Sequence, residues 1–132
     1  MGPQSAGAIP GPVCYEKGGT QPSLTDAALA MGHLNPDNFL GGEMRLEVSK
    51  AEEALRKYVS EPLSLDIISA CRGIYDVLLA KTVSAIREIT VEAGLDPREF
   101  SMLGFGGGGG MFVPLVGREM GTKEIIIPKK IM

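Results

Sequence analysis

The spacing of apolar residues predicts two helices in the middle of the chain. Four apolar side chains share one face of the first helix: Ala51, Ala54, Leu55 and Tyr58. This face follows the run Ser-Lys-Ala-Glu at 49–52, where the serine and glutamate side chains can each bind a free backbone amide as a capping box. We expect Pro62 to end this helix, because proline lacks the backbone N–H that continues a helix.

The second predicted helix is longer. It begins after Ser64, which can cap it, and ends at Ala93, with Gly94 as its C-terminal stop. Its apolar residues form a broad stripe: Leu65, Ile68, Ile74, Leu78, Ala85, Ile86 and Ile89. Gly73 is unexpected inside this helix, since a glycine there costs about 1 kcal/mol relative to alanine. Close packing against another backbone is the simplest explanation for it.

After Asp96-Pro97 the period of the pattern changes. It predicts a buried strand over residues 100–105, a turn at Gly106 to Gly110, a helix over 111–120 and a second strand over 124–127. A strand, glycine turn, helix and strand within about 30 residues is typical of a βαβ unit with two parallel strands. Two strands make no finished sheet, so we expect the isolated chain to self-associate or to be unstable.

The first 45 residues are rich in glycine and proline, with eight glycines and five prolines between Gly2 and Gly42. Apolar residues interleave with them, which indicates an ordered loop region and not a flexible linker. One short helix should begin near Thr25-Asp26 and stop at Gly32. The pattern predicts a single α/β or α+β domain over 1–132: a loop region at 1–45, helices over 46–94, and the βαβ unit over 95–132.

Composition narrows the range of functions. The 132 residues include 13 Lys+Arg and 16 Asp+Glu, for a formal net charge of -3, so the basic face that nucleic acid or anionic lipid would need is missing. No stretch has the length and hydrophobicity of a membrane span or a signal peptide. Two cysteines are too few for a secreted disulfide framework, which favours reduced thiols and a cytoplasmic protein.

The glycine run is the strongest candidate site. Gly106, Gly107, Gly108 and Gly109 leave backbone amides and a helix N-terminus facing whatever approaches, which suits a nucleotide, although a structural tight turn remains open. Residues 104–109 also satisfy the dinucleotide pattern G-x-G-x-x-G. The second strand lacks the acidic residue that NAD needs at its end. The remaining and weaker alternative is NADP, whose extra phosphate would contact Lys129 and Lys130.

Two further residues are candidates for catalysis. Asp26 could bind Mg²⁺, for which it is a weak candidate, or orient a substrate; the alternative is that it caps a helix. Cys14 could be an active-site thiol or a metal ligand, but a buried small side chain explains it as well. A zinc site from both residues and His33 fits no recognised ligand spacing, so we assign no metal site.

Two blocks of sequence resemble the hydantoinase A and 5-oxoprolinase family, which includes N-methylhydantoinase A and subunits of acetone and acetophenone carboxylases. The first block runs Gly-Pro-Gln-Ser-Ala-Gly-Ala-Ile-Pro-Gly-Pro-Val-Cys-Tyr at 2–15 and continues through Gly18-Gly19-Thr20 and Thr25-Asp26-Ala27 to Gly32–Pro36. The second block comprises Gly73-Ile74, Ala85-Ile86-Arg87, Asp96-Pro97 and Phe105-Gly106-Gly107. The two blocks occur in the family's order and cover nearly the whole chain.

The resemblance implies a C-terminal fragment of an actin-like, sugar-kinase-like ATPase fold. The turn at Gly106 to Gly109 would contact the adenosine part of ATP, while loops upstream of this chain hold the phosphates and Mg²⁺. The implied activity is ATP-dependent opening of a cyclic amide, through phosphorylation of the amide oxygen, or ATP-dependent activation of a ketone for carboxylation. The implied partners are the remaining hydantoinase A domain, or a hydantoinase B-like subunit, in an oligomer. The fragment alone would be inactive.

Several positions depart from the family's pattern. We would expect Pro at Gly110, His at Phe112, and Asn at Leu79 and Lys81. If polar groups at these positions take part in chemistry, this protein cannot use them in the same way. The alternatives are therefore a non-catalytic nucleotide-binding or assembly module of a carboxylase-type complex, and, with less support, an NADP-binding oxidoreductase fragment.

Overall fold

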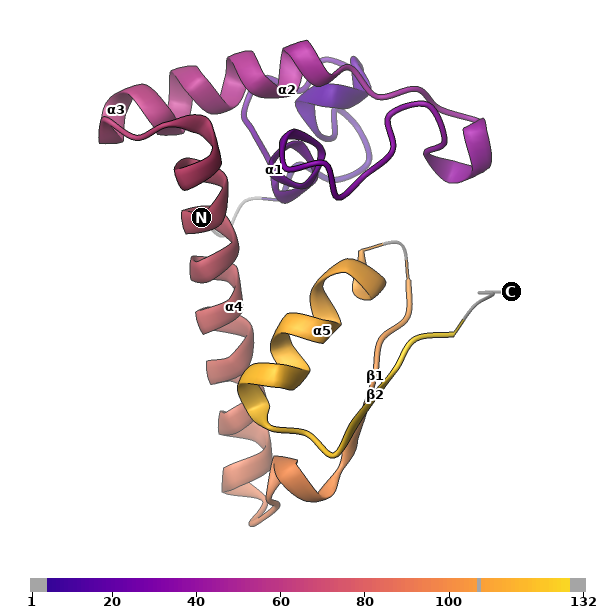
Figure 1. The fold of residues 1–132 in the computed structure, drawn as a ribbon, viewed down its shortest axis with the longest axis vertical. Helices are drawn as coiled ribbons and strands as arrows, with labels where there is room; N and C mark the ends of the chain where they lie inside the picture. The colour runs from indigo at the N-terminus through magenta and orange to yellow at the C-terminus, as the bar shows by residue number, and fades with distance from the viewer. Residues whose placement is uncertain (1–4, 107, 129–132) are drawn as a thin grey trace. The chain divides into compact units, whose positions relative to one another are not determined.

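The computed structural model describes residues 5–106 and 108–128, which form two compact units, Met1–Asp76 and Val77–Met132. The boundary between these units falls inside the longest described helix, whereas the sequence predicted one domain. The first unit contains η1 (Val13–Tyr15), α1 (Leu24–Ala30), η2 (Leu40–Gly42), α2 (Val48–Leu55), η3 (Arg56–Ser60), α3 (Glu61–Leu63) and the start of α4 (Ile67–Glu92). The second contains the rest of α4, then η4 (Pro97–Glu99), β1 (Ser101–Leu103), α5 (Gly109–Met120) and β2 (Glu124–Ile126) (Figure 1).

Helix α1 begins slightly earlier than the sequence suggested. Ser23 is its N-cap and Asp26 occupies the third helical position, and the two residues form a reciprocal capping box. The predicted start near Thr25 is therefore one residue late, because Ser23 supplies the capping hydroxyl. The predicted stop is confirmed, since Gly32 follows the helix with a φ of 75° that favours glycine.

The helix predicted to start with a capping box at 49–52 starts differently. It begins at Val48 after Glu47, and no side chain caps it. It also does not end at Pro62: α2 passes through the π-helical turn η3 into α3, which contains Pro62. The helix ends one residue later, at Leu63, because Ser64 adopts a left-handed conformation with φ 53°.

Helix α4 confirms the predicted long helix and its glycine stop. Asp66 begins it by accepting the backbone N–H of Ser69, and Gly94 ends it with a φ of 71°. The predicted stripe is only partly buried, since Leu65, Ile68, Ala85 and Ile89 are exposed. The packing explanation for Gly73 is wrong: this residue is exposed, and a Cβ there would meet nothing within 4 Å.

The first unit packs around a small apolar cluster. Cys14, Leu29, Leu46 and Ala51 are buried in it, and Tyr15, Leu34, Phe39, Met44 and Val48 pack against it. The rings of Tyr15 and Phe39 lie 5.6 Å apart between centroids, in the range of favourable aromatic contact. This cluster joins the loop before α1 to α2, which explains how a segment so rich in glycine holds a defined path.

The second unit contains the predicted βαβ arrangement. Strands β1 and β2 are parallel, with Ser101 opposite Glu124 and Leu103 opposite Ile126. Helix α5 lies between the strands and the second half of α4 (Figure 1). The core of the second unit consists of Val83, Val116 and Met120. Four partly buried residues pack against it: Leu79, Ile86, Met102 and Phe112.

Both strands are shorter than predicted, at three residues each, and the first is not buried as expected. Leu103 is 54% exposed, because α5 covers only one face of the pair. None of the helices among the described residues combines the length and the apolar character that a membrane span needs.

Candidate functional site: the glycine turn and the loop before α1

The glycine turn joins the end of β1 to the start of α5. Gly104 still belongs to the parallel ladder, since its backbone N–H donates to the carbonyl of Ile126 at 2.9 Å. Gly106 then reverses the chain with a φ of 86°, a conformation that favours glycine. Gly108 is the N-cap of α5, so the sequence places a helix N-terminus directly after a parallel strand. Gly107, one of the four predicted nucleotide contacts, lies outside the described residues.

The glycines of this segment divide into two groups by what surrounds them. A Cβ on Gly104 would lie 2.8 Å from the side chain of Val113, so α5 occupies the space beside that residue. Gly117 is similar, because a Cβ there would lie 2.6 Å from the side chain of Ile125. These two glycines let α5 approach the strands closely.

Gly106 and Gly108 differ, because a Cβ at either position would meet nothing within 4 Å. A Cβ on Gly109 would be in ordinary contact with the backbone of Gly104, at 3.6 Å. Internal packing therefore accounts for Gly104 and Gly117, and backbone conformation for Gly106. Neither accounts for Gly108, where open space remains at the helix start.

The turn carries no charge of its own. No charged residue occurs between Glu99 and Arg118, and no side chain caps the N-terminus of α5. The first amides of a helix carry a partial positive charge and lack partners within the helix. Phe105, four residues before the start of α5, has 70% of its surface exposed. The turn therefore offers backbone donors to the acceptor atoms of a ligand and adds no charged side chain of its own.

Asp26 lies at the centre of the loop that precedes α1. It is fully buried. One carboxylate oxygen accepts the backbone N–H of Cys14 at 2.8 Å. The other accepts the N–H and the hydroxyl of Ser23, at 2.7 and 2.8 Å, and the N–H of Val13 at 3.3 Å. Four donors offset the cost of burying the charge and tie the loop to the first turn of α1.

Cys14 is also fully buried, in contact with the same carboxylate. Burial, then a hydrogen bond from the thiol to Asp26, then the charge of Asp26 together raise the pKa of Cys14 to about 12. At neutral pH this side chain is a thiol, whereas nucleophilic attack and metal binding need the thiolate. Catalytic roles for Cys14 and Asp26 stay predictions, and this geometry favours the structural alternatives of a buried side chain and a helix cap.

The structure does not bring the predicted site residues together in one unit. Asp26 and Cys14 belong to the first unit, and the glycine turn belongs to the second. Lys129 and Lys130, the possible NADP contacts, lie outside the described residues. Within the described residues, no group of three or more His, Cys, Asp or Glu side chains could hold a metal ion.

Sequence reasoning missed two features that the structure brings out. Ser23 is the reciprocal partner of Asp26, and the run Ser-Leu-Thr-Asp at 23–26 contained the signal, since Ser or Thr followed three residues later by an acid is typical of a helix start. The backbone crossing of Gly11 and Gly19 had no signal beyond the glycines themselves. A Cβ on Gly19 would lie 2.2 Å from the carbonyl oxygen of Gly11, so only glycine allows this approach.

Residues 1–131 match the family described as Hydantoinase/oxoprolinase. The chain belongs to this family. The match spans both sequence blocks and therefore includes the Asp26 loop and the glycine turn.

Relatives of known name lie within this hydantoinase/oxoprolinase family. The chain is 46% identical over 129 residues to caprolactamase subunit alpha of Pseudomonas jessenii, covering 98% of this chain and 18% of that relative. It is 42% identical over 109 residues to the acetophenone carboxylase gamma subunit of Aromatoleum aromaticum, covering 83% of this chain and 15% of the relative. The chain thus spans less than a fifth of the length of these relatives.

Solved structures agree with the fold. The crystal structure of ATP-dependent caprolactamase from Pseudomonas jessenii matches with a TM-score of 0.89 at 46% identity, over 97% of this chain and 18% of that chain. The nucleotide-free structure of acetone carboxylase, an enzyme of ATP-dependent acetone carboxylation, matches with a TM-score of 0.88 at 30% identity. This match covers 96% of this chain and 18% of that chain. The hydantoinase/oxoprolinase family thus includes ATP-dependent enzymes that act on a lactam or a ketone, and several of its members are subunits of larger enzymes.

Proposed function

We propose that this chain contributes the adenosine-contacting turn of an ATP-dependent hydantoinase/oxoprolinase enzyme that hydrolyses a cyclic amide. The relatives support the use of ATP, since a caprolactamase and an acetone carboxylase with matching folds are both described as ATP-dependent. Cyclic amide is the substrate class because the relative at 46% identity is a caprolactamase subunit. The chain spans 18% of that relative, so the complete activity belongs to a larger assembly.

One observation carries the assignment of the turn. Gly108 has open space where a Cβ would stand, directly at the uncapped start of α5, whereas Val113 occupies the space beside Gly104. A glycine that neither packing nor a positive φ requires leaves a helix N-terminus accessible, as close approach of a ligand to the backbone needs. The nucleotide contacts are Gly106, Gly108 and Gly109, together with Gly107 as the sequence predicted.

The residues present fit adenosine better than the rest of ATP. The turn supplies amide donors and the exposed ring of Phe105, but no cation for the phosphates and no carboxylate for Mg²⁺. Asp26, the weak Mg²⁺ candidate, has its oxygens engaged by four donors. We therefore assign the phosphates and Mg²⁺ to parts of the enzyme outside this chain. When bound, ATP supplies a phosphoryl group that makes a resonance-stabilised amide attackable by water.

A second function is supported by the positions that depart from the family's pattern. Leu79 and Phe112, where we expected polar residues, both pack against the cluster of Val83, Val116 and Met120. Apolar groups that fill a core do not take part in acid-base chemistry, which favours a non-catalytic nucleotide-binding or assembly module of a carboxylase-type complex. No relative described above is named an oxidoreductase, so the NADP alternative gains nothing from the comparisons.

The test uses a chimaera in which this chain replaces the matching segment of caprolactamase subunit alpha. Calorimetric titration with Mg-ADP should show binding, and titration with NADPH should show none. Caprolactam-stimulated ATP hydrolysis by the chimaera, with its partner subunits, separates the two functions: stimulation supports the hydrolase, and ADP binding without stimulation supports the non-catalytic module. A chimaera that folds and binds NADPH but not ADP would contradict both.

A further inference from the structure

Ser60 has a buried hydroxyl that no other described residue satisfies. The residue is 4% exposed and ends the π-helical turn η3. Its side-chain oxygen is buried and has no hydrogen-bond partner within the described part of the chain. The backbone carbonyl of Ser60 does have a partner, because it accepts the N–H of Leu65 at 2.9 Å. The unpaired group is therefore the hydroxyl itself.

The other buried polar side chain that the structure describes in the first unit is fully satisfied. Asp26 is buried, and its carboxylate accepts four hydrogen bonds. Burying a hydroxyl without a partner costs free energy, and the large majority of buried side-chain polar atoms in proteins bond to protein or to ordered water. The Ser60 hydroxyl therefore needs a partner beyond those that the described chain places around it.

Ser60 does not use the partner that a helical serine usually has. A serine hydroxyl inside a helix often donates to the carbonyl four residues earlier, which here belongs to Arg56. In η3 that carbonyl accepts the N–H of Glu61, five residues later, because the turn is π-helical. The hydroxyl of Ser60 makes no bond to it. A carbonyl oxygen has two lone pairs, so the Arg56 carbonyl can accept a second donor.

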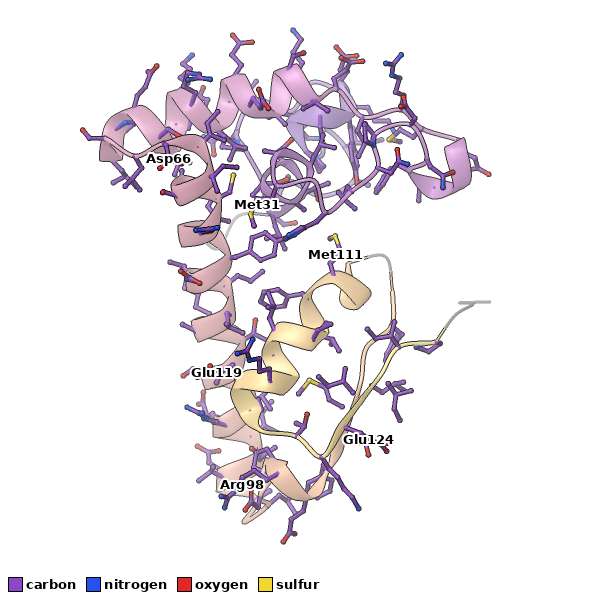
Figure 2. The ribbon with its side chains drawn as sticks, in the orientation of Figure 1. Met31, Asp66, Arg98, Met111, Glu119 and Glu124 are labelled. Carbon is purple, nitrogen blue, oxygen red and sulfur yellow. The ribbon has the colours of Figure 1, made fainter. Side chains whose placement is uncertain are left out.

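We propose that a buried water molecule links the Ser60 hydroxyl to the Arg56 carbonyl. The water accepts the hydroxyl proton and donates to the carbonyl, since residues four apart lie on the same face of a helix. Insertion of water into the hydrogen-bond ladder is one cause of irregular helix geometry, so the water also stabilises the π-helical turn. The site precedes the corner where α3 leads into α4, at which Figure 2 labels Asp66. The inference concerns the first unit alone and does not depend on nucleotide binding.

Water fits this site better than an ion does. The charged residues beside Ser60 in the sequence are Arg56, Lys57 and Glu61, and all three are exposed. They would not balance the charge of an ion bound at a buried hydroxyl, and an unbalanced buried charge is costly. Water is neutral and can both donate and accept, and internal waters make two to four hydrogen bonds.

A crystal structure of the caprolactamase chimaera, at a resolution that shows ordered water, tests the proposal directly. A water should lie about 2.8 Å from both the Ser60 hydroxyl oxygen and the Arg56 carbonyl oxygen. A direct bond from the Ser60 hydroxyl to a carbonyl would overturn the proposal, and so would a hydroxyl with no water beside it.

Two serine-to-alanine variants of the 132-residue chain provide an independent measurement. Ser84 is exposed on α4, so Ser84→Ala measures the gain in helix propensity alone. Ser60→Ala has the same gain but loses the water-mediated bonds. Its equilibrium constant for unfolding in urea should therefore be at least about threefold larger than that of Ser84→Ala. If Ser60→Ala is as stable as Ser84→Ala or more so, the hydroxyl contributes no hydrogen bond and the proposal fails.

Discussion

Gly104 and Val113 are in direct contact across the strand-helix junction of the second unit. A Cβ on Gly104 would lie 2.8 Å from the Cβ and both methyl carbons of Val113, closer than side chains pack. Gly104, whose backbone N–H donates to Ile126 of β2, is therefore also a residue that α5 approaches closely. The open turn at Gly106 and Gly108 lies between this contact and the start of α5.

The contact predicts a size-dependent penalty at residue 104. Gly104→Ala should lower the free energy of unfolding by about 1 to 3 kcal/mol, because the added methyl overpacks the junction. Gly108→Ala adds the same methyl into open space and should change stability by less than about 0.5 kcal/mol. Urea unfolding measures both. Combining Gly104→Ala with Val113→Ala should recover part of the loss, and strictly additive effects of the two changes would show that the residues do not meet.

The buried carboxylate of Asp26 predicts a structural phenotype. Asp26→Asn turns one acceptor oxygen into a donor facing backbone N–H groups, so we expect a loss of at least about 2 kcal/mol in the free energy of unfolding. Asp37→Asn is the control, because the Asp37 carboxylate is exposed and forms an exposed ion pair with Arg45. Should Asp26→Asn abolish activity of the chimaera while stability is unchanged, the catalytic interpretation of Asp26 would be right instead.

The raised pKa of Cys14 predicts weakening of the fold at alkaline pH. Folding raises the pKa of the thiol from 9.0 to about 12, so the folded state keeps Cys14 protonated at a higher pH than the unfolded state does. The stability linked to this proton is complete below pH 9 and is lost as the pH rises from 9 towards 12. Cys14→Ser keeps a donor to Asp26 without that titration, so its urea midpoint should fall less between pH 8.5 and 10.5. An equal fall in both proteins would rule out the linkage.

The loop after α4 predicts an unusually acidic carboxyl group. Arg98 donates through its side chain to both oxygens of Asp96, at 3.0 and 2.7 Å, and its backbone N–H adds a third bond. The side-chain bonds are the largest cause, and together the contacts hold the pKa of Asp96 at about 2. Its contribution to stability is therefore present above pH 4 and lost as the pH falls through about 2. In an NMR titration Arg98→Ala should move this pKa back towards 3.8, and an unchanged value would contradict the contact.

The sequence predicted the elements whose signals are local. Gly32 and Gly94 were expected to stop helices and do so, because a left-handed residue after a helix is a requirement of the backbone itself. The change of period after Asp96 predicted the βαβ unit, whose parallel pairing the structure contains. The capping box at 49–52 failed because Val48 already lies in the helix, which starts after Glu47.

Features set by tertiary contacts could not be predicted from local patterns. The apolar spacing of α4 predicted burial for Ile89, but spacing identifies a face without identifying what covers it, and Ile89 is 72% exposed. For the candidate site, the glycine run marked the right segment. It did not distinguish Gly104, where Val113 leaves no room for a side chain, from Gly108, where nothing in the described chain excludes one. That distinction needs coordinates.

The most direct test of the central claim is to compare Mg-ADP binding by two variants of the caprolactamase chimaera, Gly108→Val and Gly73→Val. Both glycines have open space where a Cβ would stand and lack a positive φ, so neither position excludes a side chain on those grounds. If the turn contacts adenosine, calorimetry will show a dissociation constant at least about tenfold larger for Gly108→Val, a loss of about 1.4 kcal/mol in binding free energy. The dissociation constant of Gly73→Val will not change. Equal ADP affinity in the two variants would contradict the claim and leave the glycine turn a purely structural element.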